Sequence, residues 1–231
     1  MKTIGLLGGM SWESTALYYS LINNGVKEKL GGLHSAKIAM YSVNFDEIEK
    51  LQHAGDWDAA AVILCDAAKK IEAAGADFLL ICTNTMHKLA PQVEAAIDIP
   101  LLHLADATAL AIKQASFSHV GLLGTAFTME QDFYKGRLID NHDLDVIVPD
   151  SDDRAIVHRI IYDELCRGVV RDDSRDAYLR IIDKLKAQGA ECVIEGCTEI
   201  VMLVQQQHTD IPLFDTTAIH AQAAVAMAIA S

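Results

Sequence analysis

Three segments in the first half of this chain recur, in the same order, in the second half. The pairs are GLLGG at 5–9 with GLLGT at 121–125, AGADFLLICTNT at 74–85 with QGAECVIEGCTE at 188–199, and IPLLHLADATA at 99–109 with IPLFDTTAIHA at 211–221. The offset between partners is nearly constant, which an ordered set of chance matches would not produce. The chain is therefore predicted to contain two copies of one structural unit.

Short apolar runs alternate with helical patterns along both halves. The runs expected as strands are KTIGLLG, AKIAMYSV, ADFLLIC, IPLLHL, HVGLLG, DLDVIVP, AECVIEG and IPLFD, and the helical patterns cover 13–29, 57–74, 126–140, 152–167 and 174–188. Continuous apolar strands separated by helices indicate parallel sheets that are covered on both faces. We predict an α/β protein with two similar parallel-sheet domains, related by internal duplication.

The last helical pattern, TTAIHAQAAVAMAIA, affects where the domains divide. Its alanine-rich composition suits close packing, and we expect it to return to the first domain. The first domain then comprises residues 1–103 plus 212–231, and the second comprises residues 104–211.

Composition and charge exclude several classes of partner. A net charge of −13 argues against nucleic acid and anionic membranes, which both select for Lys and Arg. No apolar run reaches the roughly 18 residues of a membrane span, and early glycines with Glu13 interrupt any signal-peptide pattern. Five cysteines without paired spacing favour free thiols and the cytoplasm. The histidine and cysteine spacings predict no metal site, and GLLGGM lacks the dinucleotide-binding fingerprint.

Small polar or thiol-bearing residues follow four of the expected strands. They occupy residues 8–11, 82–85, 124–128 and 196–199. Ligands of open parallel sheets bind beyond the carboxyl ends of the strands, where helix N-termini offer amides to a carboxylate. We therefore expect the active site in a cleft between the two domains, formed by these strand ends.

The internal repeat distinguishes two neighbouring side chains. Aligning the halves places Thr83 opposite Cys197, whereas Cys82 falls on Gly196. A shift of one residue along a strand turns a side chain to the opposite face. Thr83 and Cys197 are therefore expected at the cleft and Cys82 in the core. The other cysteines, expected to serve packing, are Cys65, Cys166 and Cys192.

Five motifs resemble those of the aspartate/glutamate racemase family, the cofactor-independent amino-acid racemases. They are GLLGGMSWEST, CTNTMHK, GLLGTAFTM, GCTEI and DTTAIHA, and the resemblance spans essentially the full length. It implies an isomerase that inverts acidic amino acids without pyridoxal phosphate or another cofactor, and it implies a homodimer. In the family pattern, a cysteine before NT and another in GCTE flank the substrate Cα.

The resemblance assigns roles residue by residue. Cys197 takes the place of the second catalytic cysteine, and Thr83 stands where the first would be. That departure resembles a subgroup described as specific for the L-enantiomers of aspartate and glutamate. The substrate-binding positions implied are Met10, Ser11, Gln52, Asn84, Thr85, Thr125, Thr128, Thr198 and Glu199.

The chemistry of these residue types fits proton abstraction at Cα. That proton is weakly acidic, so its removal needs a positioned base and stabilisation of negative charge. A thiol can serve, because a helix N-terminus lowers its pKa, and Cys197 is expected between a strand and a helix. Glu199 opposes this effect, and the Thr83 hydroxyl is not an equivalent base. Two alternatives remain open: another superfamily member, such as a maleate isomerase or hydantoin racemase, and a non-catalytic dicarboxylate-binding protein.

Overall fold

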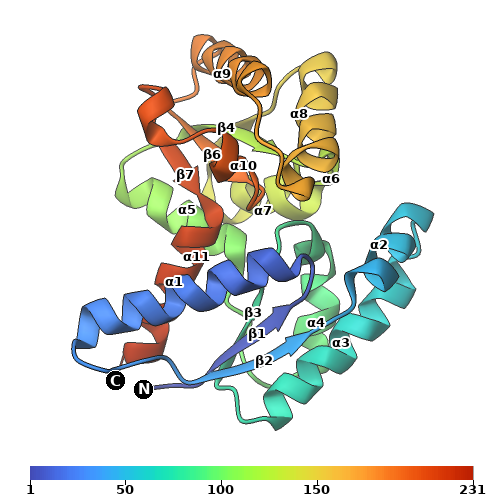
Figure 1. Cartoon of the computed structure of the whole chain (residues 1–231), viewed down its shortest axis with the longest axis vertical. Coiled ribbons are helices and arrows are strands. Elements are labelled where there is room, and N and C mark those ends of the chain that lie inside the picture. Colours follow the sequence, from blue (N-terminus) through green and yellow to red (C-terminus); the bar gives the residue numbers. More distant parts are fainter. Residues whose placement is uncertain (231) are drawn as a thin grey trace. The chain divides into compact units, whose positions relative to one another are not determined.

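The computed structural model describes residues 1–230, which form two compact units (Figure 1). Unit 1 contains Met1–Leu104 and the chain from His220 onward, and unit 2 contains Ala105–Ile219. Each unit is built around one wholly parallel sheet with helices on both faces. The predicted class, two parallel-sheet α/β domains, is confirmed.

The sheet of unit 1 has the strand order β2-β1-β3. Its strands are β1 (Ile4–Gly8), β2 (Ile38–Ser42) and β3 (Phe78–Ile81). The segment IPLLHL, expected to be a strand, contributes only a parallel bridge between Leu101 and Leu79. Every residue of β1 and β3 is buried, as expected for strands covered on both faces.

Helices pack on both faces of this sheet. They are α1 (Trp12–Leu30), α2 (Phe45–Ala54), α3 (Trp57–Ala73), the short 3₁₀-helix η1 (Thr85–Leu89), α4 (Ala90–Ala96) and most of α11 (Thr216–Ile229). One face of the sheet buries Leu7, Leu79 and Ile81 against α3, and the other buries Ile4, Leu6, Phe78 and Leu80 against α1 and α11. Side-chain alternation along β1 and β3 thus divides the core of unit 1 in two.

Unit 2 repeats the strand order of unit 1. Its sheet has the order β5-β4-β6-β7, with β4 (His119–Gly124), β5 (Asp145–Ile147), β6 (Cys192–Gly196) and β7 (Leu213–Asp215). The central strand in both units is the first one, and its neighbours are the next two along the chain. This shared order is what an internal duplication predicts.

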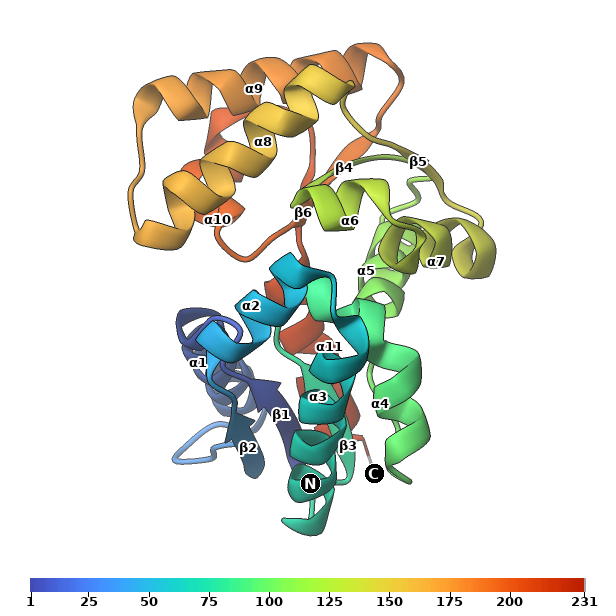
Figure 2. The ribbon, with the colours of Figure 1, turned by 90° about the vertical axis from the view of Figure 1, so that its right-hand side faces the viewer.

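Eight helical segments besides α11 belong to the second half of the described chain, one of them the short 3₁₀-helix η3 (Gln206–His208). The other seven are α5 (Leu104–Gln114), α6 (Ala126–Glu130), α7 (Asp132–His142), α8 (Ser151–Asp163), η2 (Leu165–Arg167), α9 (Asp172–Ala187) and α10 (Ile200–Leu203). The pattern at 126–140 forms two helices because Gln131 has an extended backbone. Helices α8 and α9 lie side by side over a core cluster that includes Leu123, Val193 and Tyr178 (Figure 2). In residues 1–230 no helix is long and apolar enough to cross a membrane.

The return of the chain to unit 1 occurs later than the sequence suggested. Strand β7 pairs in parallel with β6, and this pairing holds the chain in unit 2 as far as Ile219, beyond the expected boundary at residue 211. From His220 onward, α11 packs its small side chains into the core of unit 1. The alanines of this face are Ala221, Ala224 and Ala228.

Three buried histidines lie together in unit 1. The rings of His87 and His103 are 4.5 Å apart, and those of His87 and His220 are 5.9 Å apart. His220 donates from Nε2 to the carbonyl of Leu102 at 2.8 Å and accepts at Nδ1 from the Tyr18 hydroxyl at 2.9 Å. Burial, followed by the charge of His87, lowers the pKa of His220 to about 3. The imidazole of His220 is therefore neutral in the folded protein.

This burial makes the stability of unit 1 sensitive to acid. The pKa of His220 is lower in the folded than in the unfolded chain, so the unfolded chain binds more protons between these two values. The stabilisation is complete above about pH 6.5 and is lost as pH falls toward 3, by at most about 1.4 kcal/mol per pH unit. Urea unfolding at several pH values should show this slope in wild type and a shallower one in His220→Gln.

The exposed His53 supplies the matched control, since its side chain is 62% accessible. His53→Gln should keep the wild-type dependence of unfolding free energy on pH. Equal slopes for His220→Gln and wild type would contradict the assignment of the acid sensitivity to His220.

Candidate active site

The turn after β1 is too tight for side chains at its first two positions. Gly9 has φ 94°, and a Cβ there would collide with the backbone of Val43 at the end of β2. A Cβ on Gly8 would collide with the side chain of Thr15, whose Oγ1 accepts the Gly9 amide at 2.8 Å. The two glycines thus let the first turn of α1 lie directly against the strand end.

Met10 and Ser11, predicted to contact substrate, follow these glycines. Met10 is buried in the core beside β1, whereas Ser11 is half-buried and caps α1 by accepting the Ser14 amide at 3.2 Å. Ser14 in turn donates to the carbonyl of Cys82 at 3.1 Å. This contact connects the turn after β1 to the turn after β3.

At the end of β3, strand alternation separates Cys82 from Thr83. Cys82 is fully buried in the core formed with α1 and α11, and burial raises the pKa of its thiol strongly. Thr83 is half-buried, and its carbonyl accepts a hydrogen bond from His87 Nδ1 at 2.8 Å. His87 Nε2 accepts the Leu104 amide at 3.2 Å. His87 thus holds the Thr83 carbonyl through one ring nitrogen and the Leu104 amide through the other.

The remaining predicted positions of unit 1 are more deeply buried. Asn84 and Thr85 directly follow Thr83 and are 4% and 8% exposed. Gln52 lies on α2 and is 5% exposed. Of the unit 1 candidates, Ser11 and Thr83 therefore have the most accessible side chains.

In unit 2, the turn after β4 is held by hydroxyl groups and a histidine. Thr125 caps α6, its Oγ1 lying 3.4 Å from the Thr128 amide and 3.3 Å from Thr128 Oγ1. Thr128 is fully buried and packs its methyl group where β4 and β6 end in Gly124 and Gly196. His158 Nδ1 accepts the Ala126 amide at 3.1 Å. Thr128 thus shapes the turn, and Thr125, 5% exposed, is buried beside it.

The turn after β6 contains the candidate thiol. Cys197, Thr198 and Glu199 are all half-buried and follow the last strand residue directly. Cys197 Sγ donates a hydrogen bond to Glu199 Oε2 at 3.0 Å. The hydroxyl of Thr198 accepts from the hydroxyl of Thr217 at 3.4 Å. A thiol, a carboxylate and two hydroxyls therefore meet at one strand end.

Electrostatics at Cys197 differ from the sequence-based expectation. Burial, followed by the negative charge of Glu199, raises the pKa of the Cys197 thiol well above its usual value. Helix α10 has only four residues, Ile200–Leu203, so its dipole is weak. The expected lowering by a helix N-terminus is outweighed, and the thiol is held in its protonated form beside a proton acceptor.

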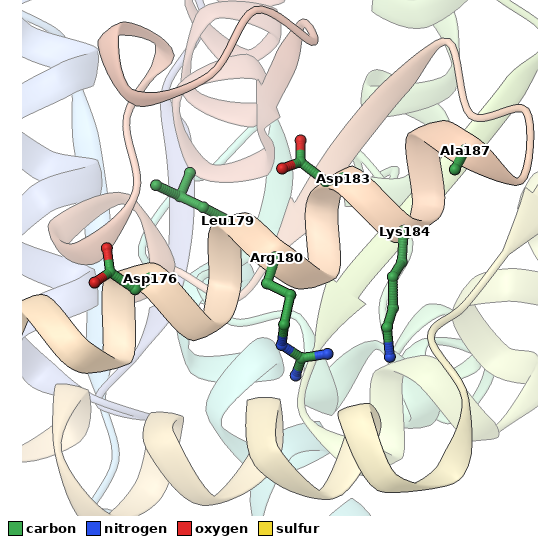
Figure 3. A pocket seen from close by; sticks show the side chains of 6 residues that line it. All are labelled: Asp176, Leu179, Arg180, Asp183, Lys184 and Ala187. Carbon is green, nitrogen blue, oxygen red and sulfur yellow. The ribbon is translucent and has the colours of Figure 1, made fainter.

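A surface hollow of about 540 Å³ lies along α9 (Figure 3). It is lined by Asp176, Leu179, Arg180, Asp183, Lys184 and Ala187. Arg180 and Lys184 point to one side of the helix and ion-pair with the buried Asp153, each at 2.6 Å. The hollow contains none of the predicted site residues, and its cations serve to neutralise Asp153. Nowhere in residues 1–230 are three or more His, Cys, Asp or Glu side chains grouped to hold a metal ion.

Sequence reasoning missed three groups around these turns. His158 supports the turn after β4, and its position in a helical pattern gave no signal. Glu195 and Asp215 are acidic residues near the ends of two adjacent strands. Glu195 did leave a signal, because it is the one charged residue within the apolar run CVIEG.

Comparisons with known proteins agree with the predicted resemblance. The Asp/Glu/Hydantoin racemase family model matches residues 7–224. A solved structure from Yersinia pestis, described as an Asp/Glu racemase, is 58% identical over 100% of both chains, with a TM-score of 0.96. An aspartate racemase homologue from Pyrococcus horikoshii OT3 is 33% identical over 99% of both chains, with a TM-score of 0.87. The broad specificity amino-acid racemase RacX of Bacillus subtilis (strain 168) is 23% identical over 98% of both chains.

These matches, over the whole fold and nearly the whole sequence, define the class of enzyme as an amino-acid racemase, which is an isomerase. The chain belongs to the Asp/Glu/hydantoin racemase family.

Proposed function

We propose that this enzyme abstracts and returns the α-proton of aspartate or glutamate without pyridoxal phosphate. The observation that carries the proposal is the hydrogen bond from the Cys197 thiol to Glu199 at the end of β6. In this proposal the substrate binds at the strand-end turns, beyond the carboxyl ends of the parallel strands. Its contacts would come from the half-buried side chains of the turns that contain Ser11 and Thr198. The buried candidates would shape these turns; they are Met10, Gln52, Asn84, Thr85, Thr125 and Thr128.

Cys197 is proposed as the principal proton carrier. Its thiol proton passes to the Glu199 carboxylate, and the thiolate so formed removes the α-proton of the substrate. Since the pKa of the thiol is raised, the thiolate is scarce but strongly basic once formed. The backbone amides of the strand-end turns would stabilise negative charge that develops on the substrate carboxylate.

Thr83 is proposed to occupy the position facing the other side of Cα. A hydroxyl is a far weaker proton carrier than a thiol at neutral pH, because its pKa lies much higher. The hydrogen bond from His87 to the Thr83 carbonyl fixes the backbone at this position. Proton return should therefore favour the Cys197 side, which regenerates the starting enantiomer.

The proposal also includes a homodimer and a cytoplasmic location. The homodimer follows from the family resemblance, and the location from cysteines that are all free in this chain. Aspartate and glutamate are both retained as substrates, because the side chains that would bind the distal carboxylate are not assigned.

The first test asks which thiol carries the proton. Cys197→Ser should lower α-proton exchange by about a thousandfold or more, since each factor of ten in rate is about 1.4 kcal/mol. Cys82→Ser should retain exchange, because its side chain packs in the core. Proton NMR of L-aspartate and L-glutamate in D₂O measures both rates. Loss of exchange in folded Cys82→Ser, with exchange retained in Cys197→Ser, would exclude the proposed assignment.

The same test separates the rival functions. A dicarboxylate-binding protein without activity would bind these amino acids and exchange no α-proton. A maleate isomerase or hydantoin racemase would leave them unchanged and convert its own substrate instead.

The second test concerns the asymmetry between Cys197 and Thr83. Two enantiomers have equal free energy, so any net inversion must have equal kcat/KM in both directions. Exchange of the α-proton with retention of configuration does not have to obey this equality, because it does not interconvert the enantiomers. We expect L-substrate to exchange faster than it inverts and D-substrate to exchange poorly. Thr83→Cys should raise D-side exchange and inversion together, because it restores a thiol on the second face.

Thr83→Ser is the matched control for this variant. It keeps a hydroxyl at the same position, so the wild-type preference for exchange of the L-substrate should remain. Equal exchange of both enantiomers by wild type, or an unchanged D-side in Thr83→Cys, would contradict the single-thiol mechanism.

A further inference from the structure

Two acidic residues lie opposite each other on adjacent parallel strands of unit 2. Glu195 of β6 is the register partner of Asp215 of β7. Their neighbours two residues earlier, Val193 and Leu213, both contact the core beneath α8 and α9. Because side chains alternate along a strand, Glu195 and Asp215 point to that same face. Cys197, two residues after Glu195, also contacts this core.

Glu195 is buried without the hydrogen bonds that an ionised carboxylate requires. It is 4% exposed, and its Oε1 has no hydrogen-bond partner within residues 1–230. Asp215 differs, since its Oδ1 accepts the amides of Thr217 and Ala218 at 2.9 and 3.1 Å. Burial raises the pKa of Asp215, and these two amide bonds, which Glu195 lacks, oppose that rise by stabilising its ionised form. The environment therefore places a proton on Glu195 and a negative charge on Asp215.

The ionisable groups around Glu195 offer it no cation. From β7 it faces Asp215, and from α9 it lies near Tyr178, whose pKa is raised by burial and then by the charges of several groups. Those groups are Cys197, Cys166, Glu164 and Glu195. Arg159 ion-pairs with Glu164 at 3.6 Å.

On β4 the register partner of Glu195 is Leu123, which carries no charge. Burial and the charge of Asp215 raise the pKa of Glu195 to about 8.

We propose that Glu195 and Asp215 hold one proton between them and that this proton keeps a second negative charge away from the Cys197 end of β6. The inference deepens the proposed function and rests on it. It assigns to this carboxyl pair the alkaline limit of the Cys197 reaction, which is the pH above which activity is lost. Glu195 is a positioning residue in this proposal, since it does not touch the substrate and acts by its charge on the Cys197 end of β6.

Loss of the shared proton to solvent opposes the reaction in two ways. A carboxylate at Glu195 raises the pKa of the Cys197 thiol further, which makes the thiolate rarer. It also repels the anionic substrate from this strand end. Activity is therefore retained below the transition of Glu195 and falls as pH rises through it.

The stability of the folded protein depends on pH in the same direction as the activity. The pKa of Glu195 is raised in the folded protein, so its contribution to stability is complete below about pH 4.5 and is lost as pH rises through about 8. Glu195→Gln is neutral and of nearly the same size, so we expect it to fold and to be more stable than wild type at neutral and alkaline pH.

The first arm of the experiment titrates the carboxyl directly. Carbon-13 NMR of protein labelled at glutamate side-chain carboxyls follows every glutamate, and the Glu195 signal is the one missing in Glu195→Gln. We expect it to titrate near pH 8. A midpoint near that of exposed glutamate, about 4.3, would overturn the proposal that the pair holds a proton.

The second arm measures α-proton exchange of L-aspartate and L-glutamate against pH. About one pH unit above the transition only about a tenth of wild type keeps the proton, so Glu195→Gln should exchange about tenfold faster there. Asp215→Asn removes the neighbouring charge and should move the alkaline limit of wild type to lower pH. A purely structural role would not move the limit in opposite directions in the two variants.

Asp210→Asn is the charge-matched control. Asp210 is exposed on the surface of unit 2 and pairs with Lys186 at 2.8 Å, so the variant should keep the wild-type profile. An alkaline limit unchanged in both Glu195→Gln and Asp215→Asn would overturn the coupling to Cys197. Absence of exchange in wild type would contradict the proposed function, and the coupling with it, whereas the carboxyl titration would still decide whether the pair holds a proton.

Discussion

Side-chain alternation along parallel strands governs which groups of this protein are accessible. Directly after β3 it buries Cys82 in the core formed with α1 and α11 and leaves the next residue, Thr83, half-buried. In β6 it turns Glu195 to the face beneath α8 and α9, and Cys197 contacts the same core from the turn that follows. A shift of one residue in either strand would turn these side chains to the opposite face. The identity of the reactive groups therefore depends on strand register.

The strand ends can approach closely because they lack side chains. Gly124 and Gly196 lie on neighbouring strands, where a Cβ on either would meet the other strand's backbone at 3.0 Å or less. Thr128 closes the space above them with its methyl group. The carboxylate of Glu199 then meets the thiol of Cys197 beside this compact turn. Backbone packing thus fixes the geometry in which a thiol and its proton acceptor can act as a pair.

The repeated motifs predicted the fold class because strand runs and glycine turns are local patterns that duplication preserves. The same alignment separated Thr83 from Cys82, since alternation depends only on position along a strand. The run IPLLHL did not become a strand of the sheet, since its one ladder contact is the isolated bridge between Leu101 and Leu79. The raised pKa of the Cys197 thiol was not predictable, since it depends on burial and on the orientation of Glu199. The pairing of Glu195 with Asp215 required the register of two strands distant in sequence.

The most direct test of the central claim, cofactor-independent exchange by side chains alone, uses protein stripped with hydroxylamine and a chelator. Proton NMR in D₂O then follows the α-proton of L-aspartate, L-glutamate and L-alanine. The account predicts that an acidic amino acid loses its α-proton signal and that alanine keeps its own. Exchange that appears only after pyridoxal phosphate is added, or exchange of alanine as fast as that of the acidic amino acids, would contradict it.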